Sequence, residues 1–373
     1  MTAPLTAITM PKWGLTMTEG KVVAWLCEAG APIAPGDELL EIETSKITNV
    51  VEAEAPGTLL RVVAPEGATL PIGGLLAVVG PADAPAADVD AFVSGFVVPE
   101  PDEQAAEAGE APSPRMLDAG GTRLRYLELG SGAGTPVLLL HGFGADLNTW
   151  MFNQPALAEA RRVVALDLPG HGGSARDVGT GDAEALQKAV AALVDMLDLG
   201  AAHVVGHSLG GALAVLLAAH RPDLVRSLTL IAPAGLGSEI NAAFIDGFVR
   251  ASRRKEAVEV LQLLVHDPSL VSRSMVEDVL RFKRLDGVAA ALAAVAQAWF
   301  AGGRQQVSVA ADLAKLAIPA QLIWGREDQI VPLTHARSAP PGAAIHVLDG
   351  AGHLPHMEKA GEVNRLIRRF IEG

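Results

Sequence analysis

The chain has 373 residues with one cysteine, Cys27, and its 43 acidic against 29 basic side chains give a net charge of −14. This length allows two or three domains. A single cysteine excludes an internal disulfide and is typical of a protein in a reducing cytoplasm. The acidic excess argues against a nucleic-acid partner. The N-terminus shows no basic-then-apolar signal segment and no apolar run reaches the length of a membrane span, so we expect no membrane partner.

Two copies of one pattern occupy the first 80 residues, at a constant offset of 37 residues. A fixed period indicates an internal repeat, and its short apolar segments between Gly and Pro predict two similar half-sheets. Lys46 falls on the turn between the copies, so we expect it to be exposed at the tip. The glycines that keep the offset are Gly20, Gly30 and Gly36, matched by Gly57, Gly67 and Gly73.

The residues around this lysine carry a resemblance to a known module. Met10–Gly20, together with Glu41–Lys46, is similar to the lipoyl domain of 2-oxoacid-dehydrogenase-type complexes. The resemblance implies a small all-β sandwich over residues 1–80 with a lipoyl group in amide linkage to Lys46. A biotin carrier is the alternative, but it usually flanks its lysine with methionines, whereas Thr-Ser precedes Lys46 here and Ile follows it.

Residues 81–115 separate this module from the rest of the chain and are rich in Ala, Pro and Glu. They carry no long periodic apolar pattern, so we expect a disordered linker with at most a turn of helix over residues 88–96. Residues 1–115 hold 17 acidic and 5 basic side chains, a net charge of −12, which favours a basic docking partner. Related acyltransferase chains commonly carry a small helical subunit-binding domain in this region, and none is recognisable.

Continuous apolar runs alternate with helical patterns from about Leu117 onward. Buried apolar strands that alternate with helices predict an α/β fold, with a mostly parallel sheet covered on both faces, over residues 116–373. The expected strands are Leu124–Leu129, Val137–Leu140, Val163–Leu166, His203–Val205, Leu228–Ala232, Gln321–Trp324 and Ile345–Leu348, and the clearest helices are Ala183–Leu197 and Leu209–His220.

The predicted nucleophile is Ser208, in a Gly-x-Ser-x-Gly stretch between an apolar strand and a helical pattern. A serine on so sharp a turn needs small neighbours, which Gly206 and Gly210 supply. The turn would lift the hydroxyl above the sheet and aim the helix N-terminus at any negative charge that forms there. The alternative is a serine that simply caps the helix.

Ser208 needs a base, and the base needs an acid that orients it. The best-placed base is His353, on a Gly-rich loop after the last predicted strand, with His356 as its competitor. The best-placed acid is Asp328, on the loop after the preceding strand, whereas Glu327 beside it is expected to point elsewhere. The resulting chain order of Ser, Asp and His is the one expected of α/β-hydrolases.

An oxyanion hole requires two backbone donors. We assign the N–H of Leu209, directly after the nucleophile, and a second donor from His141–Gly144, where Phe143 is favoured. With these motifs, residues 117–373 resemble the α/β-hydrolase superfamily. No catalytic role is assigned to the turn that holds Asp167, His171 and Ser174.

An insertion over residues 233–318 is too long for a simple crossover, and it predicts a helical cap at about residues 237–304. Basic clusters on a cap are usually solvated helix faces, and we favour that interpretation here. The alternative is that they hold the phosphates of coenzyme A. The expected cap helices are Asn241–Val265, Ser274–Arg284 and Val288–Phe300, and the basic clusters are Arg253–Lys255 and Arg281, Lys283 and Arg284.

A lipoyl-type module joined to an α/β-hydrolase-type domain resembles the dihydrolipoamide acetyltransferase components of acetoin dehydrogenase complexes. The resemblance implies that a thiamine-diphosphate-dependent acetoin dehydrogenase leaves an acetyl group on the lipoyl arm, and that this chain passes the group to coenzyme A. It also implies a dihydrolipoamide dehydrogenase that reoxidises the arm, and a homo-oligomeric core. We assign no metal-binding role to any residue of the chain.

Two other classes of function stay open at this point. One is a thioesterase or esterase tethered to a carrier, and the other is a non-catalytic scaffold. A scaffold has no need of Ser208, Asp328 and His353 together, which argues against it. A hydrolase is harder to separate from an acyltransferase, because water competes for any acyl-serine. The cap must therefore exclude water, or the transfer must bypass a serine intermediate.

Overall fold

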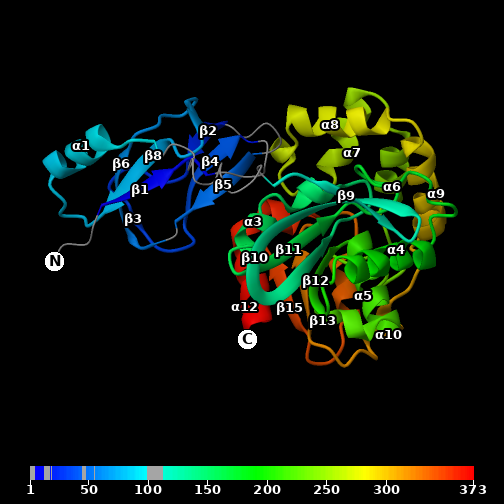
Figure 1. Cartoon of the computed structure of the whole chain (residues 1–373). Coiled ribbons are helices and arrows are strands. Elements are labelled where there is room, and N and C mark those ends of the chain that lie inside the picture. Colours follow the sequence, from blue (N-terminus) through cyan, green and yellow to red (C-terminus); the bar gives the residue numbers. More distant parts are fainter. Residues whose placement is uncertain (1–4, 12–16, 18, 44–47, 54, 99–111) are drawn as a thin grey trace. The chain divides into compact units, whose positions relative to one another are not determined.

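A computed structural model describes residues 5–11, 17, 19–43, 48–53, 55–98 and 112–373. The chain divides into two compact units, Met1–Ala111 and Pro112–Gly373. The described part of the first unit is built mainly from short antiparallel strands, and the second from a largely parallel sheet with helices (Figure 1). The predicted fold class, an all-β sandwich followed by an α/β unit, is confirmed.

Two four-stranded antiparallel sheets make up the described part of the N-terminal unit, in the orders β1-β8-β6-β3 and β5-β4-β2-β7. Apolar side chains from both sheets form one buried core, which includes Val22, Ile42, Leu59 and Leu76. The strands are β1 (Thr6–Thr9), β2 (Glu19–Trp25), β3 (Pro32–Ile33), β4 (Glu38–Glu43), β5 (Thr48–Glu52), β6 (Gly57–Val62), β7 (Thr69–Pro71) and β8 (Leu75–Gly80).

The 37-residue repeat appears in this architecture as β2, β3 and β4 recurring as β6, β7 and β8. A Cβ at Gly20 would lie 2.6 Å from the Met10 Sδ and 2.8 Å from the Ile42 Cγ2. A Cβ at Gly57 would lie 2.6 Å from the Val79 Cγ1. Ile42 and Val79 are themselves equivalent in the repeat, so each glycine leaves room for the matching side chain of a neighbouring strand. Shared packing therefore explains the constant offset.

The predicted attachment point, Lys46, lies outside the described residues. Its segment joins β4, which ends at Glu43, to β5, which begins at Thr48. Glu43 and Thr48 pair across the antiparallel ladder. The two described ends of this short connection are therefore held side by side by the sheet.

Helix α1 (Ala86–Gly95) lies within the segment expected to be a disordered linker. Val89 is buried against β8, and Phe92 and Phe96 pack at the edge of the same cluster. This spacing gives one apolar stripe along a helix, so the helix is longer than the single turn expected over residues 88–96. The described N-terminal unit thus continues past residue 80, and residues 99–111 of the expected linker lie outside the described residues.

The second unit is organised around a seven-stranded sheet in the order β11-β10-β12-β13-β14-β15, with β9 paired antiparallel to β10. Strand β10 is strongly bent and pairs with β11 through both halves, with Tyr126 opposite Leu166 and Val137 opposite Val163. Two of the expected strands are therefore parts of this one strand. The strands are β9 (Arg115–Ala119), β10 (Thr122–Leu140), β11 (Arg161–Leu166), β12 (Ala202–His207), β13 (Val225–Ile231), β14 (Ala320–Gly325) and β15 (Ala344–Leu348).

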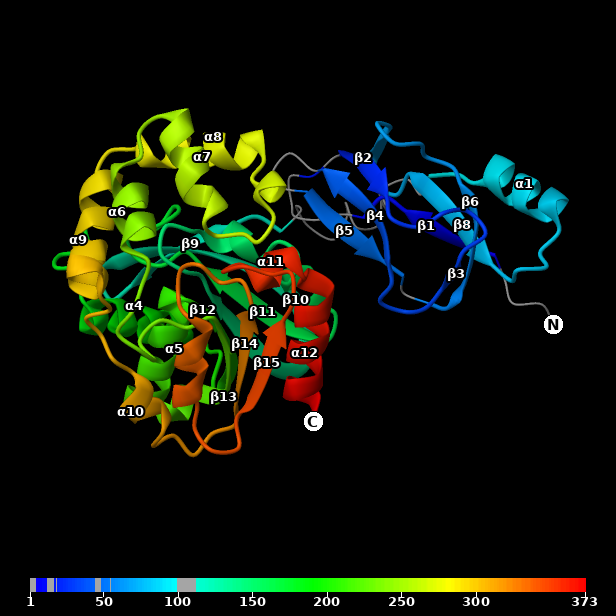
Figure 2. The ribbon, with the colours of Figure 1, turned by 180° about the vertical axis from the view of Figure 1, so that it is seen from behind.

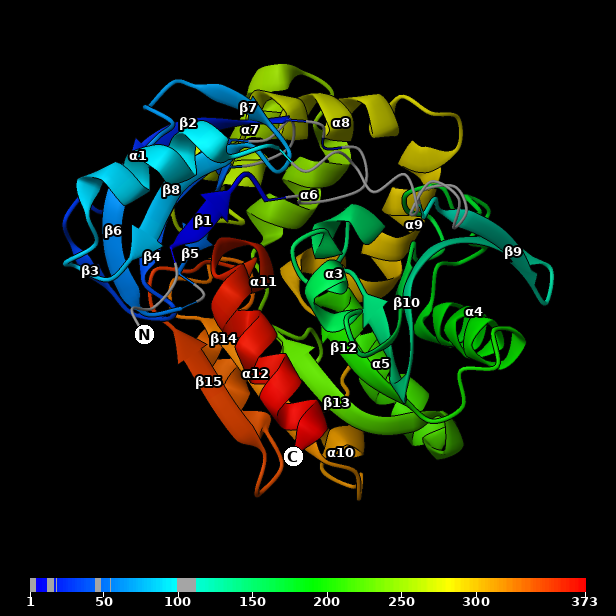
Figure 3. The ribbon, with the colours of Figure 1, turned by 60° about the vertical axis from the view of Figure 1, so that its left-hand side comes forward.

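Helices cover both faces of this sheet (Figures 1 and 2). Helices α4 (Ala183–Met196), α5 (Leu209–His220) and α10 (Ala310–Leu313) lie on one face. Helices α3 (Gln154–Leu157) and α12 (Ala360–Glu372) lie on the other, and Figure 3 shows α12 beside β13 and β14. A short helix, α11 (Pro355–Glu358), precedes α12. 3₁₀ turns occur at Leu147–Trp150, Pro222–Leu224, Pro268–Leu270, Ala301–Gly303 and Leu333–Ser338.

Four helices between β13 and β14 lie where the cap was predicted: α6 (Ala242–Arg250), α7 (Arg254–Gln262), α8 (Arg273–Lys283) and α9 (Val288–Phe300). The single helix expected over residues 241–265 is wrong, because the chain breaks between α6 and α7. Glu256 accepts hydrogen bonds from the backbone N–H groups of Ser252 and Arg253, at 2.9 and 3.1 Å. These bonds cap the N-terminus of α7, so a second helix starts here. Lys283 donates to backbone carbonyls at the end of α6, among them that of Val249 at 3.2 Å.

No single helix among the described residues has both the length and the apolar composition needed to cross a bilayer. Helices Arg273–Lys283 and Val288–Gly303 reach that composition only when joined across a 95° bend.

The packing of α1 leads to a stability prediction. Val89→Ala should lower the local unfolding free energy of the N-terminal unit by about 1–2 kcal/mol, because it removes two buried methyl groups beside Leu75 and Val78. Val97→Ala removes the same atoms from a side chain that is 78% exposed, and should cost less than about 0.5 kcal/mol. Hydrogen exchange of the β8 amides in the full chain measures both, and equal effects would contradict the packing role of α1.

Candidate active site

The loops that follow four strands of the parallel sheet each carry a predicted site residue. Phe143 follows β10, Ser208 follows β12, Asp328 follows β14 and His353 follows β15. Strands β10, β12, β13, β14 and β15 run parallel, so their carboxyl ends lie along one edge of the sheet. The cap helices lie over this edge (Figure 2). The topology therefore collects residues that are far apart in the chain.

Ser208 forms the turn between β12 and α5 with φ 51° and ψ −114°, a conformation that residues with a side chain rarely adopt. Its flanks leave no room for side chains. A Cβ on Gly206 would lie 2.4 Å from the Gly210 carbonyl oxygen, and one on Gly210 would lie 2.2 Å from that of Leu140. The hydroxyl makes no capping hydrogen bond to α5, which argues against the alternative of a simple helix cap.

Asp328 and His353 are brought together by the structure. The Nδ1–H of His353 donates to the Oδ2 of Asp328 at 2.8 Å, and both side chains are buried. Asp328 also accepts from the Trp324 Nε1–H at 3.1 Å and from the backbone N–H groups of Ile330 and Val331 at 2.8 and 3.0 Å. A carboxylate held by four donors fixes one tautomer of the imidazole and leaves its Nε2 free to accept a proton.

The two competing residues have other partners. Glu327 accepts a hydrogen bond at 3.2 Å from a backbone N–H of the loop that carries His353. His356 lies on α11 and bonds the Thr149 hydroxyl through its Nε2 at 3.1 Å. Burial, helped by the neighbouring His353, lowers the pKa of His356 to about 3, so this ring stays neutral.

The assigned oxyanion donors, the backbone N–H groups of Phe143 and Leu209, have no hydrogen-bond partner within the described part of the chain. Leu209 opens α5, whose first turn leaves N–H groups free at the positive end of the helix dipole. Phe143 follows Gly142, where a Cβ would lie 3.1 Å from the Cβ of Ser208. The loop after β10 therefore runs directly against the serine. His141 orders this loop, since its Nε2 accepts a backbone N–H from the next loop at 2.9 Å.

One side chain at the site was missed in the sequence, His207, which stands between Gly206 and Ser208. Its ring centroid lies 4.7 Å from that of His353 and 4.6 Å from that of His356. Its Nε2–H donates to the His353 carbonyl oxygen at 2.8 Å. Burial, together with the two neighbouring histidines, lowers the pKa of His207 well below its usual value. In the sequence, His207 is recognisable only as the variable residue between Gly206 and Ser208, and this position does not reveal its contact with His353.

Phe143 also links the site to the cap. Its ring meets Phe248 of α6 at 5.9 Å and Phe300 of α9 at 5.8 Å, both nearly edge to face. His171 contacts the same ring at 5.8 Å. Phe143 as a whole residue is only 7% exposed. This aromatic cluster packs the cap onto the loop that runs against the serine.

The turn after β11 is tied together by Asp167. Its carboxylate accepts the backbone N–H groups of Leu147 and Gly173, each at 2.7 Å, and pairs with Arg125 at 3.0 Å. Burial raises the pKa of Asp167 to about 6. The hydroxyl of Ser174 donates to the Asp167 carbonyl oxygen at 2.6 Å. These contacts give both residues structural partners.

Several of the basic side chains of the cap are engaged locally. Lys283 binds the end of α6, as described above. Arg281 pairs with Asp278 at 3.0 Å and Arg254 with Glu277 at 3.5 Å. Exposed pairs of this kind contribute little to stability, but they occupy cations that a phosphate group would otherwise meet. The favoured interpretation, solvated helix faces, stays a prediction, and phosphate binding stays its alternative.

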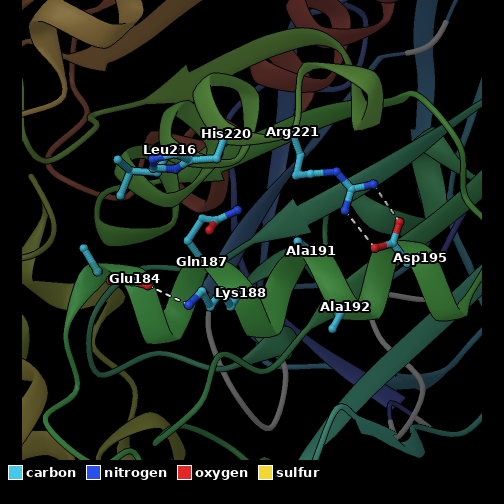
Figure 4. A pocket seen from close by; sticks show the side chains of 10 residues that line it. Glu184, Gln187, Lys188, Ala191, Ala192, Asp195, Leu216, His220 and Arg221 are labelled. Carbon is cyan, nitrogen blue, oxygen red and sulfur yellow. Dashed lines mark hydrogen bonds and ion pairs between the residues drawn. The ribbon is translucent and has the colours of Figure 1, made fainter.

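A groove of about 630 Å³ lies between α4 and the far end of α5, and Figure 4 shows the side chains that line it. Its charged side chains pair with one another, Lys188 with Glu184 at 2.6 Å and Arg221 with Asp195 at 2.8 Å. Ser208 lies at the opposite end of α5. Without a serine or cysteine in its lining, this groove is not a candidate site for acyl transfer. Within the described residues, no group of three or more His, Cys, Asp or Glu side chains is arranged to hold a metal ion.

Two protein-family models match the chain in succession. The model described as biotin-requiring enzyme matches residues 6–79, and the model described as alpha/beta hydrolase fold matches residues 135–360. Among solved structures, a meta-cleavage product hydrolase from Pseudomonas fluorescens IP01 is similar with a TM-score of 0.63 at 25% identity. That match covers 69% of this chain and 97% of the hydrolase, and it supports the fold of the second unit.

Two curated relatives are similar to both units. The chain is 47% identical over 364 residues to the dihydrolipoyllysine-residue acetyltransferase component of the acetoin cleaving system of Pseudomonas putida, over 98% of each chain. It is 46% identical over 367 residues to the protein of the same description from Cupriavidus necator, over 98% of this chain and 97% of the relative.

The contact between Asp328 and His353 leads to a kinetic prediction. Asp328→Asn should slow hydrolysis of a small activated acetyl ester by on the order of 10³–10⁴-fold, because an amide no longer holds the required imidazole tautomer. Glu327→Gln is the matched control on the same loop and should retain nearly the full rate. The release of the leaving group measures both variants. Similar rates for Asp328→Asn and the unaltered chain would exclude the orienting role.

The buried histidines predict how stability depends on pH. Burial lowers the pKa of His171 and His356 to about 3 and of His141 and His203 to about 4, against about 6.5 in an unfolded chain. Between these values the unfolded state binds more protons, so the unfolding free energy should fall as the pH falls from about 6.5, by up to about 1.4 kcal/mol per pH unit for each histidine. Asp167 acts in the opposite direction below about pH 6, because burial raises its pKa. Urea unfolding followed at about pH 7 and about pH 5 measures the net effect, and equal or greater stability at the lower pH would contradict it.

Proposed function

Because this chain belongs to the family of dihydrolipoyllysine-residue acetyltransferase components of acetoin cleaving systems, we propose that it passes an acetyl group from a lipoyl arm on Lys46 to coenzyme A through an ester of Ser208. The observation that carries the proposal is the hydrogen bond of 2.8 Å between buried His353 and Asp328, at the same sheet edge as the strained Ser208 turn. Acyl transfer requires a base with a fixed tautomer within reach of a serine, and the two residues follow strands whose ends lie along one sheet edge.

The N-terminal unit fits the carrier role. Glu43 and Thr48, on either side of Lys46 in the sequence, pair across one sheet, and side chains of both sheets form one packed core. A lipoyl group in amide linkage to Lys46 would supply a thioester on a long, movable arm. The net charge of −12 over residues 1–115 would favour a basic docking surface on the partners that charge and reoxidise the arm.

In the first half of the reaction, Ser208 attacks the acetyl carbonyl of the thioester. The Nε2 of His353 takes the hydroxyl proton, and Asp328 stabilises the imidazolium that forms. The N–H groups of Leu209 and Phe143 hold the negative oxygen of the tetrahedral species. When the carbon–sulfur bond breaks, His353 returns its proton to the departing sulfur. The acetyl group is then an ester of Ser208.

The second half runs through the same residues in reverse. His353 removes the proton from the thiol of coenzyme A, whose sulfur attacks the Ser208 ester. The same backbone donors hold the oxyanion, and the Ser208 oxygen leaves with the proton from His353. One thioester has been exchanged for another, and the serine is regenerated.

Water is the competitor in this scheme, because hydrolysis of the acyl-serine runs strongly downhill. The structure offers two means of limiting it. Neutral His207 and His356 pack behind the base. The cluster of Phe143, Phe248 and Phe300 packs the cap onto the neighbouring loop. The apolar rings of the phenylalanine cluster would leave few places for a water molecule on that side of the ester.

The partners we propose are the ones that this reaction requires. A thiamine-diphosphate-dependent acetoin dehydrogenase would charge the arm, and a dihydrolipoamide dehydrogenase would reoxidise it. A homo-oligomeric core would gather several arms at these enzymes. The described part of the N-terminal unit contains α1 as its only helix, so docking would use the carrier unit or the C-terminal unit rather than a small helical bundle within the described residues.

A carrier-tethered thioesterase or esterase is the second candidate function. The observation in its favour is the likeness of the second unit to a solved hydrolase, with a comparable fold over 97% of that chain. The products separate the two candidates, since a hydrolase yields free acetate and a transferase yields acetyl-coenzyme A.

Replacing the nucleophile tests the proposal. In the assembled complex supplied with acetoin and coenzyme A, Ser208→Ala should reduce acetyl-coenzyme A formation by about 10³-fold or more, because no hydroxyl is left to accept the acetyl group. The exposed Ser269 provides the control variant Ser269→Ala, which should behave as the unaltered chain. Both acetate and acetyl-coenzyme A are quantified. Full transfer by Ser208→Ala would eliminate the acyl-serine route, and acetate as the main product of the unaltered chain would favour the hydrolase.

A further inference from the structure

The loop that carries His353 is bonded to the cap through its backbone. The N–H of His353 donates to the carbonyl oxygen of Leu264, just beyond α7, at 2.8 Å. A Cβ on Gly352 would lie 2.8 Å from the backbone nitrogen of His266 and 2.9 Å from the Leu264 oxygen. The end of a cap helix is therefore packed onto the loop of the base without space for a side chain between them.

Glu358 joins these two segments with one carboxylate. Its Oε2 accepts the backbone N–H of His266 in the cap at 2.7 Å. Its Oε1 accepts the N–H groups of Gly352 and Leu354, which flank His353 in the chain, at 2.9 and 3.3 Å. Glu358 itself lies on α11, which continues directly from this loop. One side chain thus bonds the cap and both sides of the base.

We propose that Glu358 is a positioning residue that couples the cap to His353, so that the base is aligned with Ser208 only while residues 264–266 are bound to its loop. This inference rests on the proposed function and deepens it. A general base must reach the hydroxyl within hydrogen-bond distance, and a displacement of about 1 Å costs on the order of 10²-fold in rate. A cap segment that lifts away removes two of the contacts that hold the base loop. Water that enters a lifted cap then meets a misaligned base, which protects the acyl-serine from hydrolysis.

Glu358→Gln separates the bond to the cap, at His266, from the bonds to the loop of the base, at Gly352 and Leu354. A carboxamide has one acceptor oxygen, and its NH₂ group cannot accept the remaining N–H. With the oxygen turned to Gly352 and Leu354, the bond to His266 is lost while the loop keeps both of its bonds. Glu362→Gln, one turn further along in α12, is the matched control, because it makes the same change of charge outside this contact.

The readout is the rate at which a small fluorophosphonate labels Ser208 in the full-length protein. In this reaction the Ser208 oxygen displaces fluoride from phosphorus, and its proton passes to His353. We expect Glu358→Gln to slow labelling by about 10-fold or more, and hydrogen exchange at the His266 amide to become faster. Glu362→Gln should change neither quantity. A purely structural role would lower the melting temperature without changing the labelling rate of the folded protein.

A labelling rate in folded Glu358→Gln equal to that of the unaltered chain, despite faster exchange at His266, would overturn the inference. If this variant does not fold, Gly352→Ala tests the same point, because the added Cβ forces the cap segment and the loop apart. Slower labelling of Gly352→Ala would support the coupling, and unchanged labelling would refute it. If the unaltered chain is not labelled at Ser208, the proposed nucleophile itself is refuted. If the unaltered chain is labelled but the variants react at the same rate, only the coupling through Glu358 is refuted.

Discussion

The structure of the site depends on the close approach of β12 and α5 at Ser208. A Cβ at either Gly206 or Gly210 would collide with backbone atoms, so the flanks of this turn take no side chain, and Ser208 between them adopts a positive φ. Such a conformation persists where the surrounding structure determines it fully, and here both the sheet and a buried helix do so. The consequence is a serine placed directly before the N-terminus of α5, where the N–H of Leu209 has no hydrogen-bond partner within the described residues. Negative charge that develops at this point meets dipoles already in place, so no reorganisation is needed during the reaction.

The base is held from three directions. Asp328 fixes the imidazole tautomer, His207 binds the backbone carbonyl of His353, and Glu358 connects the same loop to the cap. In the proposed mechanism, the contact of His207 would join the loop of the base to the strand end that precedes Ser208, and the contact of Glu358 would join the same loop to the cap. In the proposed mechanism, the lowered pKa values of buried His207 and His356 would keep fixed positive charge away from the imidazolium of His353.

Local patterns in the sequence were enough to predict the parts of the fold that local physics decides. Apolar runs located the strands, the fixed offset of glycines located the repeat, and small residues beside Ser208 located the turn. The break between α6 and α7 escaped prediction in part because Lys283, far along the chain, binds the end of α6, although Glu256 also marks the start of α7 locally. The bend that unites two expected strands in β10 and the contacts of His207 and Glu358 were missed for the same reason. Each depends on partners that only the folded chain brings together.

The central claim is that an acetyl group on the arm at Lys46 reaches Ser208 as an ester. The most direct test supplies the assembled complex with acetoin but no coenzyme A, quenches it, and maps acetyl groups on peptides of this chain by mass spectrometry. The account predicts acetyl on the peptide that contains Ser208, because an oxygen ester is more stable than the thioester that formed it, and no acetyl there in a Lys46→Arg chain. An unmodified Ser208 peptide in a chain whose lipoyl arm is fully acetylated would contradict it.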